Sequence, residues 1–258
     1  MTITRAALIT GGSSGIGKAI ARALAEDGHA VTICGRDRGK LDAAVAELSA
    51  TGSPVQGVPT DLADAAAIDA LLAEHRAAYG RMDVLVNSAA SATAGVLLAD
   101  LTTAQIDNDL AVDLRASFLT MRGSVGLLTA AGAEHGKALV VNVSSYLVRT
   151  PVPGVSVYNA AKAGLHALSE AVQTELAGSG VQVTTFVPGA IDTPLSSWLP
   201  VAGVGLEELV RPEDLAEGVR FLLRTSGSCL VREMEFVART QASIGERVQA
   251  YAAAGGSF

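Results

Sequence analysis

Short apolar runs alternate along most of the chain with stretches that have the periodicity of a helix. Seven runs are rich in β-branched residues and apolar at nearly every position, at 6–10, 30–35, 55–60, 83–89, 138–145, 181–188 and 233–238. Apolarity without alternation indicates strands that are buried on both faces of a sheet. Alanine-rich stretches of helical periodicity follow Gly15, Leu41, Ala63, Thr103, Val157 and Pro212. The pattern is therefore strand and helix repeated about six times, followed by a final strand.

This order of elements predicts an α/β fold, a doubly wound parallel seven-stranded sheet of Rossmann type with helices on both faces. We interpret residues 1–258 as a single domain. Residues 194–210 contain several Gly and Pro residues and are interpreted as an excursion over the edge of the sheet, not as a linker. Residues 250–258, AYAAAGGSF, are expected to form a frayed terminus.

Composition and charge argue against several classes of protein, among them nucleic-acid-binding, metal-binding and membrane-spanning proteins. The chain is 49% hydrophobic, enough for a large core, and its formal net charge is -7. An acidic chain is not expected to bind nucleic acid, which usually requires a basic face. The two cysteines, Cys34 and Cys229, and the four histidines lack the spacing of a metal site, so no metal is predicted. No apolar run approaches the roughly 20 residues of a membrane span, and we expect a cytoplasmic protein with no membrane partner.

A glycine-rich run, TGGSSGIG, lies between the first predicted strand and a helical pattern. Glycines let the backbone turn tightly and approach a pyrophosphate, and a helix N-terminus presents free N–H groups to its charge. This context predicts a dinucleotide site. The residues expected to contact the cofactor are Gly11, Ser13, Ser14, Gly15, Ile16 and Gly17.

The end of the second predicted strand indicates which dinucleotide binds. An acidic side chain there binds the ribose 2′-OH of NAD, whereas an arginine favours the 2′-phosphate of NADP. Arg36 follows the strand directly and Asp37 comes next. We place Arg36 beside the ribose, which favours NADP. The alternative, with Asp37 in that place, would favour NAD.

A Tyr and a Lys four residues apart, Tyr158 and Lys162, follow a pair of serines, Ser144 and Ser145, at the end of the fifth predicted strand. Residues four apart share one helix face, and strand ends and helix starts form the ligand crevice of such a sheet. A phenol has a pKa of about 10, and a nearby ammonium lowers this pKa. A Ser hydroxyl can bond a substrate oxygen that gains negative charge. These residue types predict transfer of a hydride to carbon and of a proton to oxygen.

Taken in this order, the motifs of residues 7–223 resemble those of the short-chain dehydrogenase/reductase family. The resemblance implies NAD(P)-dependent interconversion of an alcohol and a ketone or aldehyde, and a homodimer or homotetramer. It implies Ser145 rather than Ser144 as the catalytic serine, Tyr158 as proton donor, and Lys162 as partner of Tyr158 and of the nicotinamide ribose. It also implies further cofactor contacts from Asp61, Leu62, Asn87, Pro188, Gly189, Ile191 and Thr193.

The chain departs from the family pattern at three places. The family often has an Asn where this chain has Asp113, in the run LAVDL. We expect Asp113 to belong to the catalytic site, where it can organise a water and, when ionised, alters the protonation of Lys162. The family's NNAG motif is replaced by NSAA at 87–90, and its VDGG-like ending by VREMEFVARTQ at 231–241. We expect the last strand to be retained, with changed backbone packing and subunit contacts.

Three largely apolar segments, 91–101, 146–154 and 194–205, are expected to wall the substrate pocket. They favour a medium, largely apolar carbonyl compound or alcohol over a sugar phosphate. Arg149 is either a ligand for an acidic group or a solvated loop residue. Trp198 is either a pocket lid or a packing residue.

Two other classes of function are compatible with parts of the sequence. A nucleotide-binding sensor or scaffold would keep the fold without turnover, but it would not need the proton donor Tyr158 with Ser145 and Lys162. A methyltransferase would use the glycine-rich turn for another nucleotide, but it would leave YNAAK unexplained. The residues therefore favour the oxidoreductase.

Overall fold

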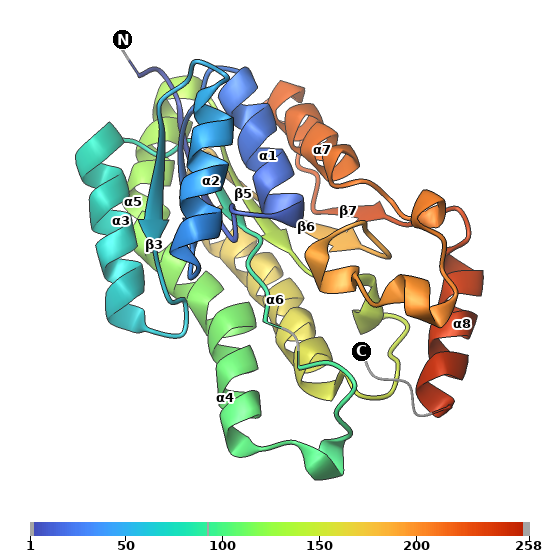
Figure 1. The fold of residues 1–258 in the computed structure, drawn as a ribbon. Helices are drawn as coiled ribbons and strands as arrows, with labels where there is room; N and C mark the ends of the chain where they lie inside the picture. The colour runs from blue at the N-terminus through green and yellow to red at the C-terminus, as the bar shows by residue number, and fades with distance from the viewer. Residues whose placement is uncertain (1–2, 92, 255–258) are drawn as a thin grey trace.

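The chain folds around one seven-stranded parallel sheet with helices on both faces (Figure 1). The structure, a computed structural model, describes residues 3–91 and 93–254. The strands are β1 (Ala6–Thr10), β2 (Ala30–Gly35), β3 (Val55–Pro59), β4 (Val84–Asn87), β5 (Ala138–Val143), β6 (Val181–Pro188) and β7 (Glu233–Phe236). Their order across the sheet is β3-β2-β1-β4-β5-β6-β7. The predicted fold class is confirmed.

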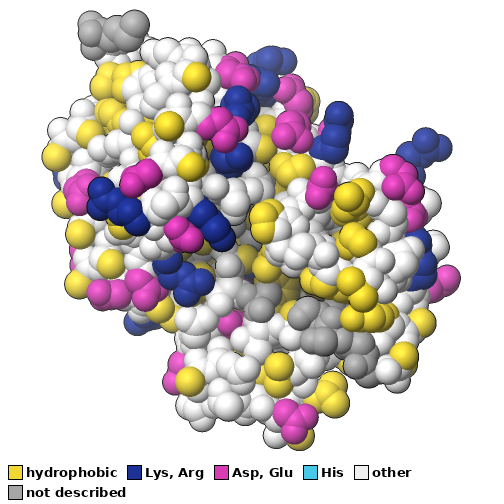
Figure 2. All heavy atoms as spheres, viewed as in Figure 1, with side chains coloured by type: hydrophobic (Ala, Val, Ile, Leu, Met, Phe, Trp, Pro, Cys, Tyr) yellow, Lys and Arg dark blue, Asp and Glu magenta, His cyan; other side chains and the backbone are white. Residues whose placement is uncertain are grey.

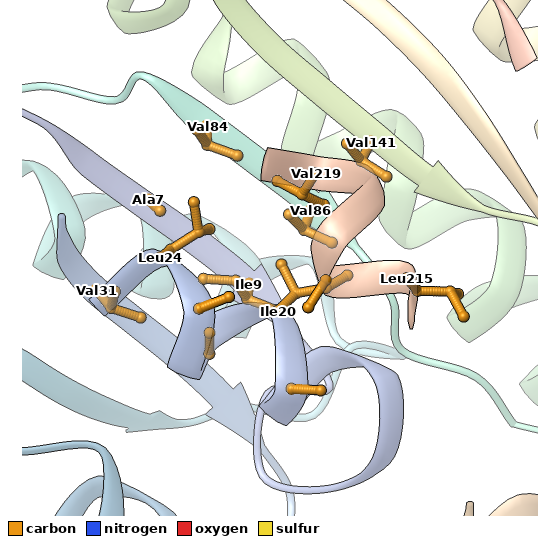
Figure 3. Close-up of a cluster of buried hydrophobic side chains, with 14 of the residues drawn as sticks. Ala7, Ile9, Ile20, Leu24, Val31, Val84, Val86, Val141, Leu215 and Val219 are labelled. Atoms are coloured by element: carbon orange, nitrogen blue, oxygen red, sulfur yellow. The ribbon is translucent and has the colours of Figure 1, made fainter. Parts of the chain in front are cut away.

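Two layers of helices enclose the sheet. One face is covered by α1 (Gly15–Glu26), α2 (Arg38–Ser49) and α7 (Pro212–Arg224). The other face is covered by α3 (Ala65–Tyr79), α5 (Ala116–His135) and α6 (Ser156–Glu175). Successive strand residues point to opposite faces, so Ile9 of β1 joins the first core and Leu8 joins the second. In the first core, Ile20 and Leu24 of α1 meet Val219 of α7 above the sheet (Figure 3).

The strand order reverses between β1 and β4. β1 pairs with β2 on one side and with β4 on the other, all in parallel. In sheets of this kind ligands bind at the carboxyl ends of the strands beside such a reversal. The glycine-rich turn leaves β1 here, and Asn87 ends β4 at the same edge. The fold therefore places the predicted dinucleotide site in the expected crevice.

The helical region that follows β4 in the chain is interrupted by a π-helical segment. α4 (Thr103–Leu110) begins with a capping box between Thr102 and Gln105. It runs into a π-helical segment, Ala111–Arg115, which continues into α5. Such π turns inside helices are rare and are often found at functional sites. The segment contains Asp113, and sequence periodicity did not reveal it.

The connection from β6 to α7, residues 189–211, is called here the β6–α7 loop. It contains three short 3₁₀ helices, Pro194–Ser196, Leu199–Ala202 and Leu206–Glu208. A parallel bridge between Ile191 and Val210 closes its base. The loop lies beside the last helix (Figure 1).

The expectation of a frayed end from residue 250 is wrong for the described residues. The last helix, α8, spans Gln241–Ala253. Its residues Ile244 and Val248, four positions apart, pack with Leu199, Val204 and Leu209 of the β6–α7 loop in a third apolar cluster. The partner for this helix face is the loop, so the helix forms where local composition indicated fraying. Residues 255–258 lie outside the described part.

None of the helices in the described residues is long and apolar enough to cross a membrane.

Candidate active site

The glycine-rich turn brings β1 and β4 into close contact. Gly11 has φ +66°, and a Cβ atom there would lie 2.8 Å from Cα of Ala89, which follows β4. Only glycine accepts both the left-handed conformation and this approach of two backbones. The chain can therefore turn sharply at the strand reversal, directly below the N-terminus of α1.

The N-terminus of α1 has no side-chain cap. Ser14 is extended at the N-cap position and its hydroxyl makes no capping hydrogen bond. By contrast, Asp37 caps α2 by accepting from Lys40 N, and Asp64 caps α3 by accepting from Ala66 N. The N–H groups of Gly15, Ile16 and Gly17 in the first turn are therefore left for an external anion. This end of α1 fits the diphosphate of a dinucleotide.

A cavity of about 680 Å³ extends from this helix end. It is bounded by Ser14, Gly15 and Lys18 on one side and by Thr193 and Pro194 of the β6–α7 loop on the other. Thr193 lies against Gly15, because a Cβ on Gly15 would be 3.2 Å from Thr193 Cγ2. Of the predicted cofactor contacts, Ser14, Gly15 and Thr193 therefore line one cavity.

The end of β2 carries the candidates for cofactor selection. Arg36 is exposed directly after the strand. Asp37 Oδ1 accepts a hydrogen bond from Lys40 N at 3.0 Å and so belongs to the start of α2. Ser13 lies beside the strand end, since a Cβ on Gly35 would be 2.9 Å from its Oγ. A hydroxyl and a guanidinium thus flank the predicted ribose position.

Three further predicted contacts lie along the same edge with different exposure. Asp61 is exposed and its Oδ1 accepts from Ala63 N at 3.0 Å, while Leu62 is buried. Both polar groups of the Asn87 side chain are used inside the protein. Its Nδ2 donates to Asn142 Oδ1 at 2.8 Å, and its Oδ1 accepts from Thr120 Oγ1 at 2.7 Å. Asn87 therefore joins β4 to β5 and α5 through its side chain.

The predicted nicotinamide contacts follow β6. Pro188 ends that strand, and Gly189 N donates to Phe236 O of β7 at 2.8 Å. Ile191 is buried and forms the bridge at the base of the β6–α7 loop. Thr193 N donates to Ser196 Oγ at 3.2 Å, which fixes the first turn of the loop. Of these residues, Thr193 lines the cavity beside α1, whereas Ile191 packs in the first core.

The two serines at the end of β5 have different partners. Ser144 Oγ donates to the main-chain carbonyl of Lys162 at 3.0 Å and thereby fixes β5 to α6. Ser145 caps a short 3₁₀ helix, Tyr146–Val148, by accepting from Leu147 N at 3.2 Å. The Ser145 hydroxyl also lies near enough to Tyr158 to lower the pKa of its phenol. The geometry therefore separates a structural serine from the one beside the phenol.

Tyr158 and Lys162 are both buried on one face of α6, as their spacing predicts. Lys162 Nζ lies 5.6 Å from the centre of the Tyr158 ring and donates to Val143 O at 3.0 Å. Burial lowers the pKa of Lys162, and the charge of Asp113 partly restores it. Burial, followed by the charge of Asp113, raises the pKa of Tyr158, whereas the Ser145 hydroxyl lowers it. The sequence predicted a lowered Tyr158 pKa, but here the ammonium is turned toward a carbonyl and desolvation prevails.

Asp113 adjoins this group from the π-helical segment. Its Oδ1 accepts from Ser91 N at 2.7 Å. Burial raises its pKa to about 6, against the attraction of Lys162 and the Ser91 hydrogen bond, while the charge of Asp109 adds to the rise. Sequence reasoning missed Asp109, which is fully buried one turn earlier on α4. The DxxxD spacing was a signal for the pair, but acids on a helix usually face solvent.

The three segments expected to wall a substrate pocket are only partly brought together. Gly95 and Gly154 are in close contact, since a Cβ on Gly154 would be 2.8 Å from Gly95 Cα. Val152 and Trp198 both pack on the apolar cluster of the β6–α7 loop. Ala92 lies outside the described residues. Arg149 forms ion pairs with Glu233 and Glu235 of β7, which neither interpretation of this residue anticipated.

Comparison with known proteins gives a consistent result. A family model described as short chain dehydrogenase matches residues 5–200. The chain is 36% identical over 234 residues to a cis-4-hydroxycyclohexanecarboxylate dehydrogenase of Sinomonas cyclohexanicum, with 88% of this chain and 92% of the relative covered.

Two solved structures with bound dinucleotides are also similar. One is a metagenomic short-chain oxidoreductase in complex with NADP, with 31% identity, a TM-score of 0.78, and 92% of this chain and 98% of that chain covered. Another is a 3-ketoacyl-(acyl-carrier-protein) reductase from Brucella melitensis complexed with NADH, with 25% identity, a TM-score of 0.81, and coverage of 91% and 97%. The chain therefore belongs to the short-chain dehydrogenase/reductase family of NAD(P)-dependent oxidoreductases that act on hydroxyl and carbonyl groups.

Proposed function

We propose that this chain is an NADP(H)-dependent enzyme that interconverts a ketone or aldehyde and an alcohol on a medium, largely apolar substrate. One observation carries the proposal: the Ser145 hydroxyl and the buried ammonium of Lys162 both lie beside the phenol of Tyr158. Buried polar groups of this kind are costly and need a reason. Proton transfer to a substrate oxygen is the reason that the three groups support best.

Each member of the group has a distinct role. When bound, a nicotinamide cofactor supplies the hydride for reduction or accepts it in oxidation. Ser145 orients the substrate oxygen by a hydrogen bond that strengthens as this oxygen gains negative charge. Tyr158 donates its proton to the same oxygen in reduction and takes it back in oxidation. Lys162, whose ammonium lies 5.6 Å from the centre of the Tyr158 ring, holds ribose hydroxyls and keeps a positive charge near the phenol.

The preference for NADP is supported by the end of β2. Asp37 already accepts a hydrogen bond from the backbone of α2, whereas Arg36 is exposed and follows Gly35, which lies beside the Ser13 hydroxyl. A guanidinium and a hydroxyl can both donate to a 2′-phosphate. We therefore assign Arg36 and Ser13 to that phosphate and the free end of α1 to the diphosphate.

An apolar substrate is supported by the rim of the crevice. Leu195, Val201 and Leu206 are exposed on the β6–α7 loop. Figure 2 shows hydrophobic side chains gathered on the right of the view, over this loop. Because the guanidinium of Arg149 is paired with two carboxylates, we assign it no role in binding an acidic substrate group. A ring alcohol of the size named for the relative from Sinomonas cyclohexanicum is a suitable first compound.

We also propose that residues 1–258 are one domain and that the protein is a cytoplasmic homodimer or homotetramer. Phe118 on α5 and Phe221 on α7 are half exposed, which supports contacts between copies through the helices. Light scattering after size-exclusion chromatography tests the number of copies. A single cooperative unfolding transition tests the domain assignment.

The experiment for the function is a panel of cyclic and aryl ketones, followed by the decrease of NADPH absorbance. Tyr158→Phe should reduce turnover by orders of magnitude and leave the NADPH dissociation constant nearly unchanged, because only the proton is removed. Retained turnover in Tyr158→Phe would reject the proton-donor assignment. Tight NADPH binding by the native protein without turnover of any carbonyl would indicate a sensor instead.

A further inference from the structure

Asp113 has an unusual environment for a carboxylate. Its side chain is 1% exposed, and its Oδ1 accepts one hydrogen bond, from Ser91 N. Its Oδ2 is buried and has no hydrogen-bond partner among the described residues. A buried, unpartnered carboxylate oxygen is costly, and a neutral amide would make the same bond to Ser91. The charge of Asp113 is therefore not required to hold the loop after β4.

Asp109 performs the structural task nearby. Its Oδ1 accepts from Ser91 Oγ at 3.0 Å, and its Oδ2 accepts from Thr93 N at 2.8 Å. Both oxygens of Asp109 are thus used to fix the loop. Asp113 lies one helical turn later, and only one of its oxygens accepts a hydrogen bond from the loop. Its charge therefore acts on the groups packed against it.

Those groups belong to α6, which packs against the π-helical segment. Its buried titratable side chains beside Asp113 are Lys162 and Tyr158. The other charged neighbour is Asp109 on α4. Arg115, on the segment of Asp113 itself, donates to the carbonyl of Ala63 and is directed away. A negative charge in this place stabilises the Lys162 ammonium and opposes a Tyr158 phenolate.

We propose that Asp113 is a positioning residue. Its buried charge moves to higher pH the point at which Tyr158 changes from proton donor to proton acceptor. The inference rests on the proposed function. In reduction the O–H bond of Tyr158 breaks, its proton goes to the carbonyl oxygen, and the hydride adds to the carbonyl carbon, which is reduced as the dinucleotide is oxidised. Tyr158 then regains a proton from solvent. Asp113 leaves the overall equilibrium unchanged and extends the donor form of Tyr158 to more alkaline solution.

The test compares pH profiles of kcat/KM for ketone reduction and for alcohol oxidation in the native protein and in Asp113→Asn. The Asn variant keeps the acceptor for Ser91 N and loses the charge. In the profiles for reduction and for oxidation alike, the part of the pH dependence that reports protonation of Tyr158 should move to lower pH by about one unit. Asp107→Asn, which removes an exposed charge from the same helix α4, is the matched control and should leave this part in place. Coincident profiles for native protein and Asp113→Asn, or a move to higher pH, would overturn the inference.

A second readout needs neither substrate nor cofactor. Because burial raises the pKa of Asp113 to about 6, its folded form binds more protons than its unfolded form between pH 4 and 6. The native protein should therefore lose denaturant resistance relative to Asp113→Asn as pH rises through this window. A difference that does not change with pH would show that folding does not raise the pKa of Asp113, which would contradict the buried, unpartnered carboxylate on which the inference rests. The function itself is judged separately, by the loss of turnover in Tyr158→Phe.

Discussion

Glu208 and Arg247 form a two-pronged ion pair that joins the β6–α7 loop to α8. Arg247 Nη1 donates to Glu208 Oε1 at 2.9 Å, and Nη2 donates to Oε2 at 2.6 Å. Arg247 Nη1 also donates to Gly203 O at 2.7 Å, and Thr240 Oγ1 donates to Glu208 Oε2 at 3.1 Å. The hydrogen bonds from Arg247 are the main cause that lowers the pKa of Glu208 to about 2. The pair thus stays charged over the working range of pH.

Removing this pair should loosen the end of the loop that contains Glu208, whereas Thr193, the predicted cofactor contact of the loop, is held separately by Ser196. In Arg247→Ala we expect KM for the carbonyl substrate to rise several-fold, with the dissociation constant of NADPH unchanged. Arg247→Lys should recover only part of the effect, because an ammonium cannot bridge both carboxylate oxygens in the same planar way. Steady-state kinetics and fluorescence titration measure the two constants. Equal KM values in all three proteins would show that α8 does not hold the substrate wall.

Arg36 should determine the choice of dinucleotide. Arg36→Asp removes the proposed donor to the 2′-phosphate and adds a like charge. A charge-assisted hydrogen bond contributes about 1.5–3 kcal/mol, so the ratio of kcat/KM for NADPH over NADH should fall at least tenfold. Arg38→Ala is the control, since Arg38 is exposed and paired with Asp42 on its own helix. An unchanged ratio in Arg36→Asp would support Asp37 as the ribose contact and NAD as cofactor.

Gly11 should tolerate no side chain. Gly11→Ala places a Cβ at a φ of +66° and 2.8 Å from the backbone of Ala89, so both stability and NADPH affinity should decrease. Gly126→Ala is the contrasting control, because Gly126 lies in α5 with open space around it. That change should raise the free energy of unfolding by roughly 0.5–1 kcal/mol. Urea unfolding and calorimetric titration of both variants decide whether the loss is local to the turn.

His75 should make the protein sensitive to mild acid. Burial lowers the pKa of His75 to about 4, against the hydrogen bond of Nε2 with Arg81 O and the charge of Asp83, which both raise it. An unfolded histidine has a pKa near 6.5, so between pH 6.5 and 4 the unfolded chain binds more protons. Stability present above pH 6.5 should be lost as the pH falls, by about 3 kcal/mol over the window. Urea unfolding at several pH values should show that the free energy of unfolding changes less with pH in His75→Gln than in the native protein.

The elements that sequence could predict are those whose signal is local. A strand buried on both faces, such as 138–143, is apolar at nearly every position whatever its neighbours are. The glycine-rich turn is set by backbone conformation at Gly11, and the pair Tyr158 and Lys162 by the pitch of one helix. The predicted sheet, the crevice and the grouping of Ser145 with Tyr158 are therefore present in the structure.

The features that escaped prediction depend on contacts between distant segments. Asp109 looks like any polar residue on a helix until its acceptors, Ser91 and Thr93, are placed beside it. Arg149 finds its carboxylate partners on β7, more than 80 residues later in the chain. The apolar face of α8 has its partner in the β6–α7 loop, so its alanines and glycines alone indicated a frayed end.

The position of α8 has a consequence for how the enzyme matures. The β6–α7 loop, which bounds the dinucleotide cavity through Thr193 and Pro194, is translated before α8, whose Ile244 and Val248 pack against it. A nascent chain that has not yet formed α8 therefore lacks the apolar partner of this loop. A protein truncated after β7 would keep β1, α1 and β4 but would lose the helix that packs against the loop.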